Sequence, residues 1–465
     1  MSSAGHGGGG LPGLGLVESF VHDSWEKGGT TITERSLIIS FGIALLTFFI
    51  LDPQQSLLNF ELLLFFSPVW MPIVLIKFGW IRWVQMRRRA FNAKQDNILL
   101  EIRMPRDTRK SPLAMEGIFS NLHLGPGESN WFKLYWNGSV RPSWSFEIVS
   151  LGGRVHFYIW TREVYRRLIE SSFYAQYPGV EIVEAVDYSL LTEPGHAPWS
   201  GFACEYKHKK PDPYPIKTYV DFGLDKQPMP KPEEQSDPLA QVLETMGSIG
   251  PKEQMWIQII IRESKGEKYN GRLNAKGAAY TWKDEAKELI EGIREGAVRK
   301  VKKVDKTTGV PYEEDGFPNP TKGEQEVINA IERNTAKHAF DVGMRGIYMA
   351  EEGHFHGVMP GALGYIWKPF NSDTLNSIGW TKWHVAFNDY PWEDPKGHHR
   401  AHVMHSALDY YRRRSFYHAP YIGDWMVMST EELATIFHVP SAGVTTPSMP
   451  RIPSATAGAP FNLPT

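Results

Sequence analysis

The sequence predicts an α+β fold that consists of a transmembrane helical hairpin near the N-terminus, two α/β sandwich-like units and a Pro-rich tail. Three observations predict it. Two apolar stretches lie between residues 36 and 76, and aromatic or β-branched runs alternate with amphipathic stretches from residue 97 onward. After residue 439 the chain is mostly Pro, Ser, Ala, Thr and Gly. We assign the parts as follows: flexible tail 1–31, hairpin 32–84, first α+β domain 85–205, connector with a short helix 206–252, second α+β domain 253–425, capped helix and Pro-rich linker 426–465.

The hairpin is predicted from residues 36–51 and 57–76, which a short polar break separates. A bilayer core requires about 20 apolar residues per helix, which the second stretch meets and the first approaches. The residues that follow the second stretch are typical of a membrane interface: Trp80, Arg82, Trp83, Arg87, Arg88 and Arg89. Because the break carries no cation, both ends and the bulk of the chain are expected in the cytoplasm, with the hairpin in the cytoplasmic (inner) membrane. The alternative is a buried core hairpin or a pair of helices lying in the membrane plane.

The first α+β domain is predicted from the order β-α-β-β-β-α-β. Its helices are expected at residues 111–122 and 162–174, the first of them opened by Ser111-Pro112. Turn signals at Asn137-Gly138 and Gly152-Gly153 separate the middle strands. The expected strands are residues 98–102, 131–136, 144–149, 155–160 and 180–186.

The second α+β domain is predicted from a similar alternation. Its strands are expected at residues 256–261 and 340–349, and its helices at 280–304, 323–337, 355–367 and 403–413, after a short helix at 238–249. The strand-then-helix pattern at 340–367 repeats that at 155–174, which indicates an internal duplication of one α+β unit. Near the end, Ser429 and Glu432 have the spacing of a capping box that opens a further helix.

The composition excludes several classes of protein. Lys plus Arg total 50 and Asp plus Glu 52, so the net charge of −2 does not favour a nucleic-acid coat. Cys204 is the single cysteine, which excludes a disulfide framework and a Cys-based zinc or iron–sulfur site. A P-loop requires the dipeptide Gly-Lys, which the sequence lacks, and neither G-x-S-x-G nor H-E-x-x-H occurs. We therefore expect no catalytic residue, no cofactor and no enzymatic activity.

One histidine cluster is the candidate for metal chemistry. His398, His402 and His405 share a face if their segment is helical, and imidazoles at that spacing bind zinc or copper. No carboxylate precedes Asp409 in this stretch to complete the site, so a solvated or interface helix is the preferred interpretation. The basic runs at residues 299–303 and 412–414 are likewise interpreted as solvated helix, and upstream glutamates allow i,i+4 pairing for the first of them. Direct nucleic-acid contact is the alternative.

Several short motifs, in their order along the chain, carry a family resemblance. They are Ile102-Arg103-Met104-Pro105-Arg106, Phe340-Asp341-Val342-Gly343-Met344-Arg345-Gly346 and the segment from Ser429 to Pro440. Over residues 98–464 the chain resembles the membrane-anchored, N-terminal non-motor part of type IV secretion and conjugation ATPases of the HerA–FtsK class. In that family a segment like residues 430–440 leads into a RecA-like motor. The motor's residues have no counterpart here, so the resemblance carries over no catalytic residue.

The resemblance implies a non-catalytic membrane subunit that docks a separately encoded hexameric ATPase. The implied partners are that cytoplasmic P-loop ATPase, other membrane subunits of a secretion system, the lipid bilayer and further copies of the chain. The residues implied in docking are Glu431, Glu432, Leu433, Phe437 and His438. The alternatives are a membrane-anchored histidine-metal hydrolase, a self-assembling membrane scaffold without a motor partner, and a subunit that guides DNA.

Overall fold

The structure, a computed structural model, describes residues 47, 49–50, 53–104, 110–125, 128, 130–191, 199–225, 237–269, 271–304, 311–381 and 398–439. The chain divides into two compact units. We call residues 1–93 and 129–140 the helical unit, and residues 94–128 and 141–465 the sheet unit. The predicted flexible tail, most of the first apolar stretch and the Pro-rich linker lie outside the described residues.

The helical unit contains α3 (Pro53–Phe65), α4 (Ser67–Ala93) and the π-helix η1 (Phe132–Trp136). The strand predicted for residues 131–136 is wrong, because this aromatic run coils into η1 and contacts α4. No single helix in the described part of the chain is long and apolar enough to cross a bilayer. The segments Pro53–Val69 and Met71–Ala93 meet the length and composition for a span only when taken together, and a bend of 58° separates them.

The sheet unit is built on one nine-stranded antiparallel sheet with the strand order β10-β5-β9-β6-β2-β3-β1-β4, and β13 also pairs with β9. Its first half comprises β1 (Asn97–Arg103), α5 (Leu113–Asn121), β2 (Trp144–Leu151), β3 (Arg154–Arg162), α6 (Arg166–Gln176) and β4 (Glu181–Glu184). Its second half comprises β5 (Trp199–His208), α7 (Pro238–Gly247), β6 (Glu253–Glu263), β9 (Ala339–Glu351), α10 (Met359–Gly364) and β10 (Ile378–Trp380).

The two halves have the same topology. Each is a βαββαβ unit whose four strands, numbered along the chain, lie in the order 4-1-3-2 across the sheet. This is the arrangement of ferredoxin-like folds. The strand–helix pairs whose resemblance indicated a duplication, β3–α6 and β9–α10, occupy equivalent positions in the two halves. The topology therefore agrees with the predicted duplication.

The halves are not separate domains, however, which corrects the predicted division at residues 205 and 253. Strands β2 and β6 pair along their length, with Phe146 opposite Ile259 and Ile148 opposite Ile257, so a single sheet runs through both halves. One edge strand of each half, β2 in the first and β6 in the second, is thereby paired, and β4 and β10 remain at the ends of the sheet.

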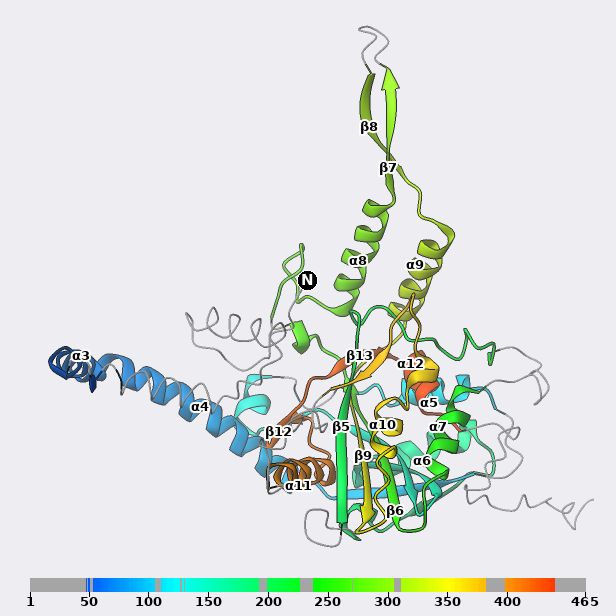
Figure 1. The fold of residues 1–465 in the computed structure, drawn as a ribbon, viewed down its shortest axis with the longest axis horizontal. Helices are drawn as coiled ribbons and strands as arrows, with labels where there is room; N and C mark the ends of the chain where they lie inside the picture. The colour runs from blue at the N-terminus through cyan, green and yellow to red at the C-terminus, as the bar shows by residue number, and fades with distance from the viewer. Residues whose placement is uncertain are drawn as a thin grey trace, which may run out of the picture. The chain divides into compact units, whose positions relative to one another are not determined.

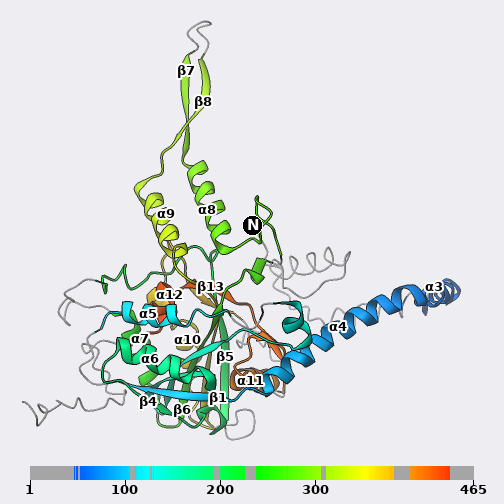
Figure 2. The same ribbon diagram turned by 180° about the vertical axis from the view of Figure 1, so that it is seen from behind.

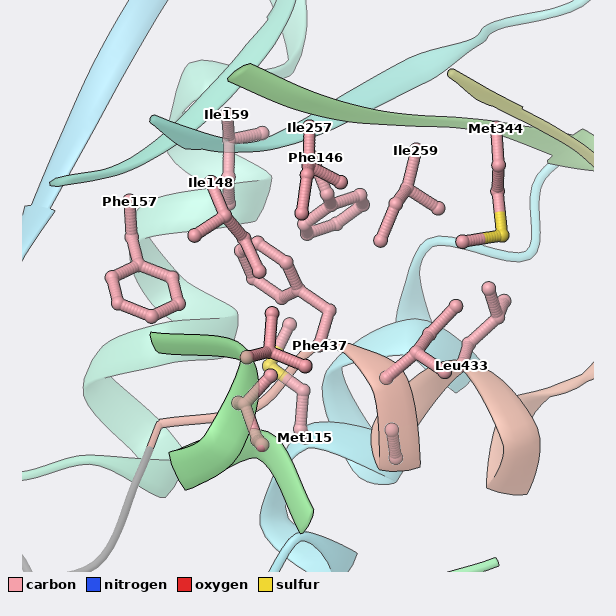
Figure 3. Packing of buried hydrophobic residues seen from close by; sticks show 14 of the residues in the cluster. Met115, Phe146, Ile148, Phe157, Ile159, Ile257, Ile259, Met344, Leu433 and Phe437 are labelled. Atoms are coloured by element: carbon pink, nitrogen blue, oxygen red, sulfur yellow. The ribbon is translucent and has the colours of Figure 1, made fainter. Parts of the chain in front are cut away.

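Both faces of the sheet are covered. The alternation along β1 places Ile98, Leu100 and Ile102 in one core and Leu99 in the other. The larger core lies under α5, α6, α7, α10 and α12 (Thr430–Ile436), and Figure 3 shows Met115, Leu433 and Phe437 packed against side chains of the sheet. The smaller core is closed by α11 (His398–Arg412), which contributes Met404, Leu408 and Tyr411.

An insertion distinguishes the second half. Between β6 and β9 the chain forms α8 (Trp282–Gly296), β7 (Val298–Val304), β8 (Pro311–Pro318) and α9 (Lys322–Thr335), and the β7–β8 ribbon extends directly from the two helices (Figures 1 and 2). We call residues 282–335 the arm. The long helix predicted for residues 280–304 is wrong beyond Gly296, and the basic run at 299–303 lies in β7 rather than on a solvated helix.

The remaining elements are short. They are η2 (Glu163–Tyr165), η3 (Tyr188–Leu191), η5 (Glu267–Tyr269), η6 (Lys368–Phe370), β11 (Tyr417–His418), β12 (Tyr421–Ile422) and β13 (Met426–Ser429). The capping box predicted at Ser429 and Glu432 is confirmed, because Ser429 N–H donates to Glu432 Oε2 at 3.0 Å and Glu432 N–H donates to Ser429 Oγ at 3.2 Å.

Candidate functional site

Aromatic and basic side chains of the helical unit gather where the apolar part of α4 ends. The ring of Trp80 lies 5.5 Å from that of Tyr135, and the ring of Trp83 lies 5.7 Å from that of Trp136. Arg87 Nε donates to the Trp136 carbonyl at 2.6 Å, which joins α4 to η1. We call α4 from residue 78 to residue 89, together with residues 131–136, the aromatic–basic cluster.

Gly138 permits this close packing. Its φ of +67° is a left-handed conformation that favours glycine, and a Cβ there would lie 2.4–2.6 Å from backbone atoms of Arg87 and Arg88. The Asn137-Gly138 turn signal therefore fixes where η1 meets α4. It does not join two strands, as the sequence predicted.

The cluster presents much of its aromatic surface to the outside. Trp131, Phe132 and Trp136 are 61%, 53% and 51% exposed, and Trp80 is 44% exposed. Two guanidinium groups lie over aromatic rings, Arg82 at 5.0 Å from the Phe78 centroid and Arg87 at 5.7 Å from the Trp83 centroid. Arg88 is half-buried and Arg89 is exposed. Amphipathic rings with adjacent cations are the composition of a membrane–water interface.

The helices before the cluster expose apolar side chains on all sides. Large hydrophobic residues that are more than a third exposed occur through α3 and the first half of α4: Leu57, Leu58, Phe60, Leu62, Leu64, Phe65, Phe66, Val69, Met71, Ile73, Leu75, Ile76 and Phe78. Glu61 and Lys77 are the two charged residues among residues 53–77, and contiguous exposed apolar surface of this size is rare on soluble proteins.

The residues that the resemblance implied in docking lie in the interior of the sheet unit. Glu431, Glu432, Leu433, Phe437 and His438 are all 2% exposed or less. The ring of Phe437 packs between those of Phe146 and Phe157, with centroid distances of 4.9 and 5.6 Å. These side chains therefore hold α12 in the core and do not form an outer surface in this conformation.

Glu431 connects α12 to the base of the arm. Its Oε1 lies 3.1 Å from Arg333 Nε and accepts from Thr218 Oγ1 at 2.7 Å, while its Oε2 lies 3.2 Å from Lys337 Nζ. Lys337 also contacts Glu116 of α5 at 2.6 Å. Arg333 lies on α9, and Lys337 contacts both Glu431 and Glu116. The buried carboxylate of Glu431 therefore links α12 to α9 directly and to α5 through Lys337.

Glu432 and His438 are buried ionisable groups at the two ends of α12. Burial raises the pKa of Glu432 to about 7, although its carboxylate accepts from the backbone N–H of Ser429 and, at 3.1 Å, of Ile216. Burial opposes the charge of His438, but Asp237 Oδ2 at 3.1 Å and the Ala434 carbonyl at 2.9 Å raise its pKa. Because both ring nitrogens of His438 face acceptors, the doubly protonated imidazolium satisfies them best.

The three histidines considered as metal ligands, His398, His402 and His405, lie on α11 as the sequence predicted, and all three are exposed. No group of three or more His, Cys, Asp or Glu side chains in the described part of the chain is placed to hold a metal ion.

The sequence did not reveal a buried ionic network beneath α11. Glu147 is fully buried on β2, where Arg414 Nε and Nη2 donate to its two oxygens at 3.0 and 3.1 Å, and Tyr188 OH donates at 2.7 Å. Arg414 also contacts Asp187, and although burial opposes its charge, Glu147 and Asp187 raise its pKa. Arg414 has a φ of +47°, which is strained for a residue with a Cβ. Every charge in this network has a partner, so the network closes the fold between β2 and α11.

The aromatic run 131–136 is a further feature at which the sequence predicts the wrong structure. Its composition of Trp, Tyr and Lys is also typical of residues at a membrane interface, which is the signal that the sequence offers here. Their strand-like spacing concealed this, because a π-helix has no simple sequence signature.

Residues 88–355 match a protein family described as a domain of unknown function, DUF8128. Neither the curated proteins nor the solved structures gave a match.

Proposed function

The chain belongs to the DUF8128 family, and from this premise we propose that it is a non-catalytic, membrane-anchored subunit whose sheet unit is a platform for other proteins. The observation that carries the proposal is the exposed apolar surface of α3 and α4, which ends at the aromatic–basic cluster. A lipid bilayer supplies both the nonpolar environment for the helices and the polar interface for the cluster.

The dimensions of the helices support an embedded pair better than a single span. The apolar part of α4, from Ser67 to Ile81, is about 22 Å long at 1.5 Å per residue, whereas a bilayer core is about 30 Å thick. With α3 the apolar length becomes sufficient, at the cost of the 58° bend. We propose that the pair dips into the cytoplasmic membrane from the side on which Arg82 and Arg87 lie, so that the sheet unit is cytoplasmic.

The proposed partners are a hexameric P-loop ATPase encoded separately and other membrane subunits of a type IV secretion-like machine. The order of the sequence motifs supports this part of the proposal. Because the side chains of α12 are buried, we assign docking to outer surfaces of the sheet unit. The arm is the favoured surface. It connects β6 to β9, whereas the equivalent strands of the first half, β2 and β3, are joined by a short turn between Leu151 and Arg154.

Two measurements test the proposal in its two parts. Flotation of the purified full-length chain with vesicles that contain anionic lipid should place it in the lipid fraction, and it should remain there after extraction with alkaline carbonate. A variant in which Ile73, Leu75 and Ile76 are each replaced by Gln should float less, whereas replacing the exposed Val164, Val186 and Leu190 of the sheet unit should have no effect. Equal flotation of both variants would contradict the anchor.

The partner is tested by gentle purification from native membranes followed by identification of stoichiometric proteins and an ATPase assay. We expect a P-loop protein to accompany the chain and to carry all of the ATPase activity. If the chain is purified alone, a platform that serves a motor is excluded, and the scaffold without a motor becomes the better description.

A further inference from the structure

The arm is an addition to a fold that is complete without it. In the first half of the sheet, β2 and β3 are joined by the tight turn at Gly152 and Gly153, whereas the equivalent strands β6 and β9 are joined through the whole arm. A duplicated unit requires only the turn, so the arm has a role other than closing the sheet.

The base of the arm is anchored firmly. Ala286 and Ile290 of α8 pack with Ile328 and Ile331 of α9 in a small core, against which Tyr214 of the sheet unit also packs. Arg333 adds contacts to Asp221 at 3.1 Å and to Glu431 at 3.1 Å. The helices therefore join the β7–β8 ribbon to the sheet unit (Figures 1 and 2).

The ribbon itself is a two-stranded antiparallel sheet, which is marginally stable in water on its own. Its two strands have opposite charge. The cations on β7 are Arg299, Lys300, Lys302 and Lys303, and this strand has no acidic residue, whereas Glu313, Glu314 and Asp315 lie on β8, which has no basic one. The register places Lys300 opposite Asp315 and Lys302 opposite Glu313. The charged residues of one strand are therefore all basic and those of the other all acidic.

We propose that the arms of neighbouring copies of this chain join edge to edge, β7 of one copy beside β8 of the next. Pairing β7 with β7, or β8 with β8, would bring like charges together, which disfavours a symmetric two-fold contact. Pairing β7 with β8 repeats the charge alternation already present within each ribbon. A contact between unlike edges is heterologous, and it generates a ring if the rotation closes.

Two further features fit this arrangement. Pro311 and Pro318 lie at the two ends of β8, where the absence of an N–H limits pairing to the residues between them and so restricts the register. Copies anchored in one membrane all face the same way, which permits cyclic symmetry. This second feature rests on the proposed function, whereas the charge argument does not.

The test uses the full-length chain in detergent, so that a failure of the membrane anchor and a failure of arm pairing are distinguishable. A swapped variant carries Glu in place of Arg299, Lys300, Lys302 and Lys303, and Lys in place of Glu313, Glu314 and Asp315. The swap preserves opposite charges within each ribbon. Light scattering coupled to size-exclusion chromatography should find that the wild type and the swapped variant each form the same oligomer.

Mixing the two proteins supplies the decisive comparison. Because β7 of the wild type and β8 of the swapped variant are both basic, we expect mixed oligomers to be at least tenfold rarer than in a mixture of two differently tagged wild-type samples. A monomeric wild type, or free mixing of wild type and swapped variant, would overturn the proposal.

A second measurement stands even if the swapped variant fails to fold. Cysteine is introduced as Val301→Cys in one sample and as Glu314→Cys in another. The native Cys204 stays unreactive, because it is fully buried and burial raises its pKa to about 12. Oxidation should give a disulfide-linked dimer in the mixture and much less in either sample alone. Equal yields in all three samples would refute pairing between unlike edges.

Discussion

Replacing Phe437 by Ala tests whether the segment after α12 is part of the core. The ring is 2% exposed and packs against Phe146 of β2 and Phe157 of β3, at centroid distances of 4.9 and 5.6 Å (Figure 3). Replacing a buried phenylalanine by alanine lowers the stability of a protein by about 3–5 kcal/mol, because the transfer free energy of the ring is lost and a cavity remains. Each aromatic pair contributes roughly 0.5–1.5 kcal/mol of that sum. We therefore expect Phe437→Ala to lower the free energy of unfolding by about 3–5 kcal/mol.

The assay is unfolding of the full-length chain in detergent by guanidinium chloride, followed through tryptophan fluorescence. The matched control is Tyr174→Ala on α6, because this aromatic side chain is 50% exposed and its loss should change the free energy by less than about 0.5 kcal/mol. A Phe437→Ala variant that unfolds within about 1 kcal/mol of the wild type would refute the assignment of Phe437 to the core.

Three further predictions concern single residues. Burial raises the pKa of Glu432 from 4.5 to about 7, so this residue contributes up to about 3 kcal/mol to the free energy of unfolding below pH ~4.5, and the contribution is lost as the pH rises to ~7. Glu432→Gln should therefore flatten the dependence of the free energy of unfolding on pH over that interval, and an unchanged slope would contradict the shift. Arg414→Met leaves the buried Glu147 without its cation and should cost about 3–5 kcal/mol in denaturant unfolding, whereas a cost below about 1 kcal/mol would mean that the network is dispensable. Gly138→Ala should detach η1 from α4 and accelerate hydrogen exchange of residues 131–136, and wild-type exchange would show that the close approach is not required.

Much of the sheet unit could be predicted from local patterns. Strands β1, β2, β3, β6 and β9 are apolar or alternating runs bounded by turn residues. The capping box of α12 depends on two residues, Ser429 and Glu432, that are three positions apart. These features are decided by residues close together in the chain. Long strands with strong periodicity are therefore visible without knowledge of the fold.

The elements that could not be predicted depend on distant partners. Strand β5 begins with Trp199-Ser200-Gly201 and precedes a Pro-rich connector, so its strand character comes from pairing with β9 and β10. The joint between β2 and β6, which makes one sheet of two halves, is a contact between residues more than a hundred positions apart. Local propensity is a weak guide where tertiary pairing decides the conformation.

Charged residues in the arm and around α12 have conformations and burial that differ from the prediction. The run at residues 299–303 follows a helix and consists of good helix formers, so it was assigned to that helix, yet Gly296 ends α8 and the chain continues as β7. The family resemblance implies that Glu431 and Glu432 lie at a docking surface. Both are buried here because cations from α9 and backbone N–H groups satisfy them.

A fluorophore placed on α4 tests directly whether this helix lies in lipid, as we propose. An environment-sensitive dye is attached to Ile73→Cys in the full-length chain in vesicles, with Val164→Cys as the control on the sheet unit, where the native side chain is 82% exposed. Since Cys204 is buried, the introduced cysteine alone reacts. We expect the dye on residue 73 to emit at shorter wavelength and to be quenched by brominated lipid, whereas the dye on residue 164 should be quenched by aqueous iodide. Quenching of both positions by iodide and of neither by brominated lipid would contradict the membrane anchor.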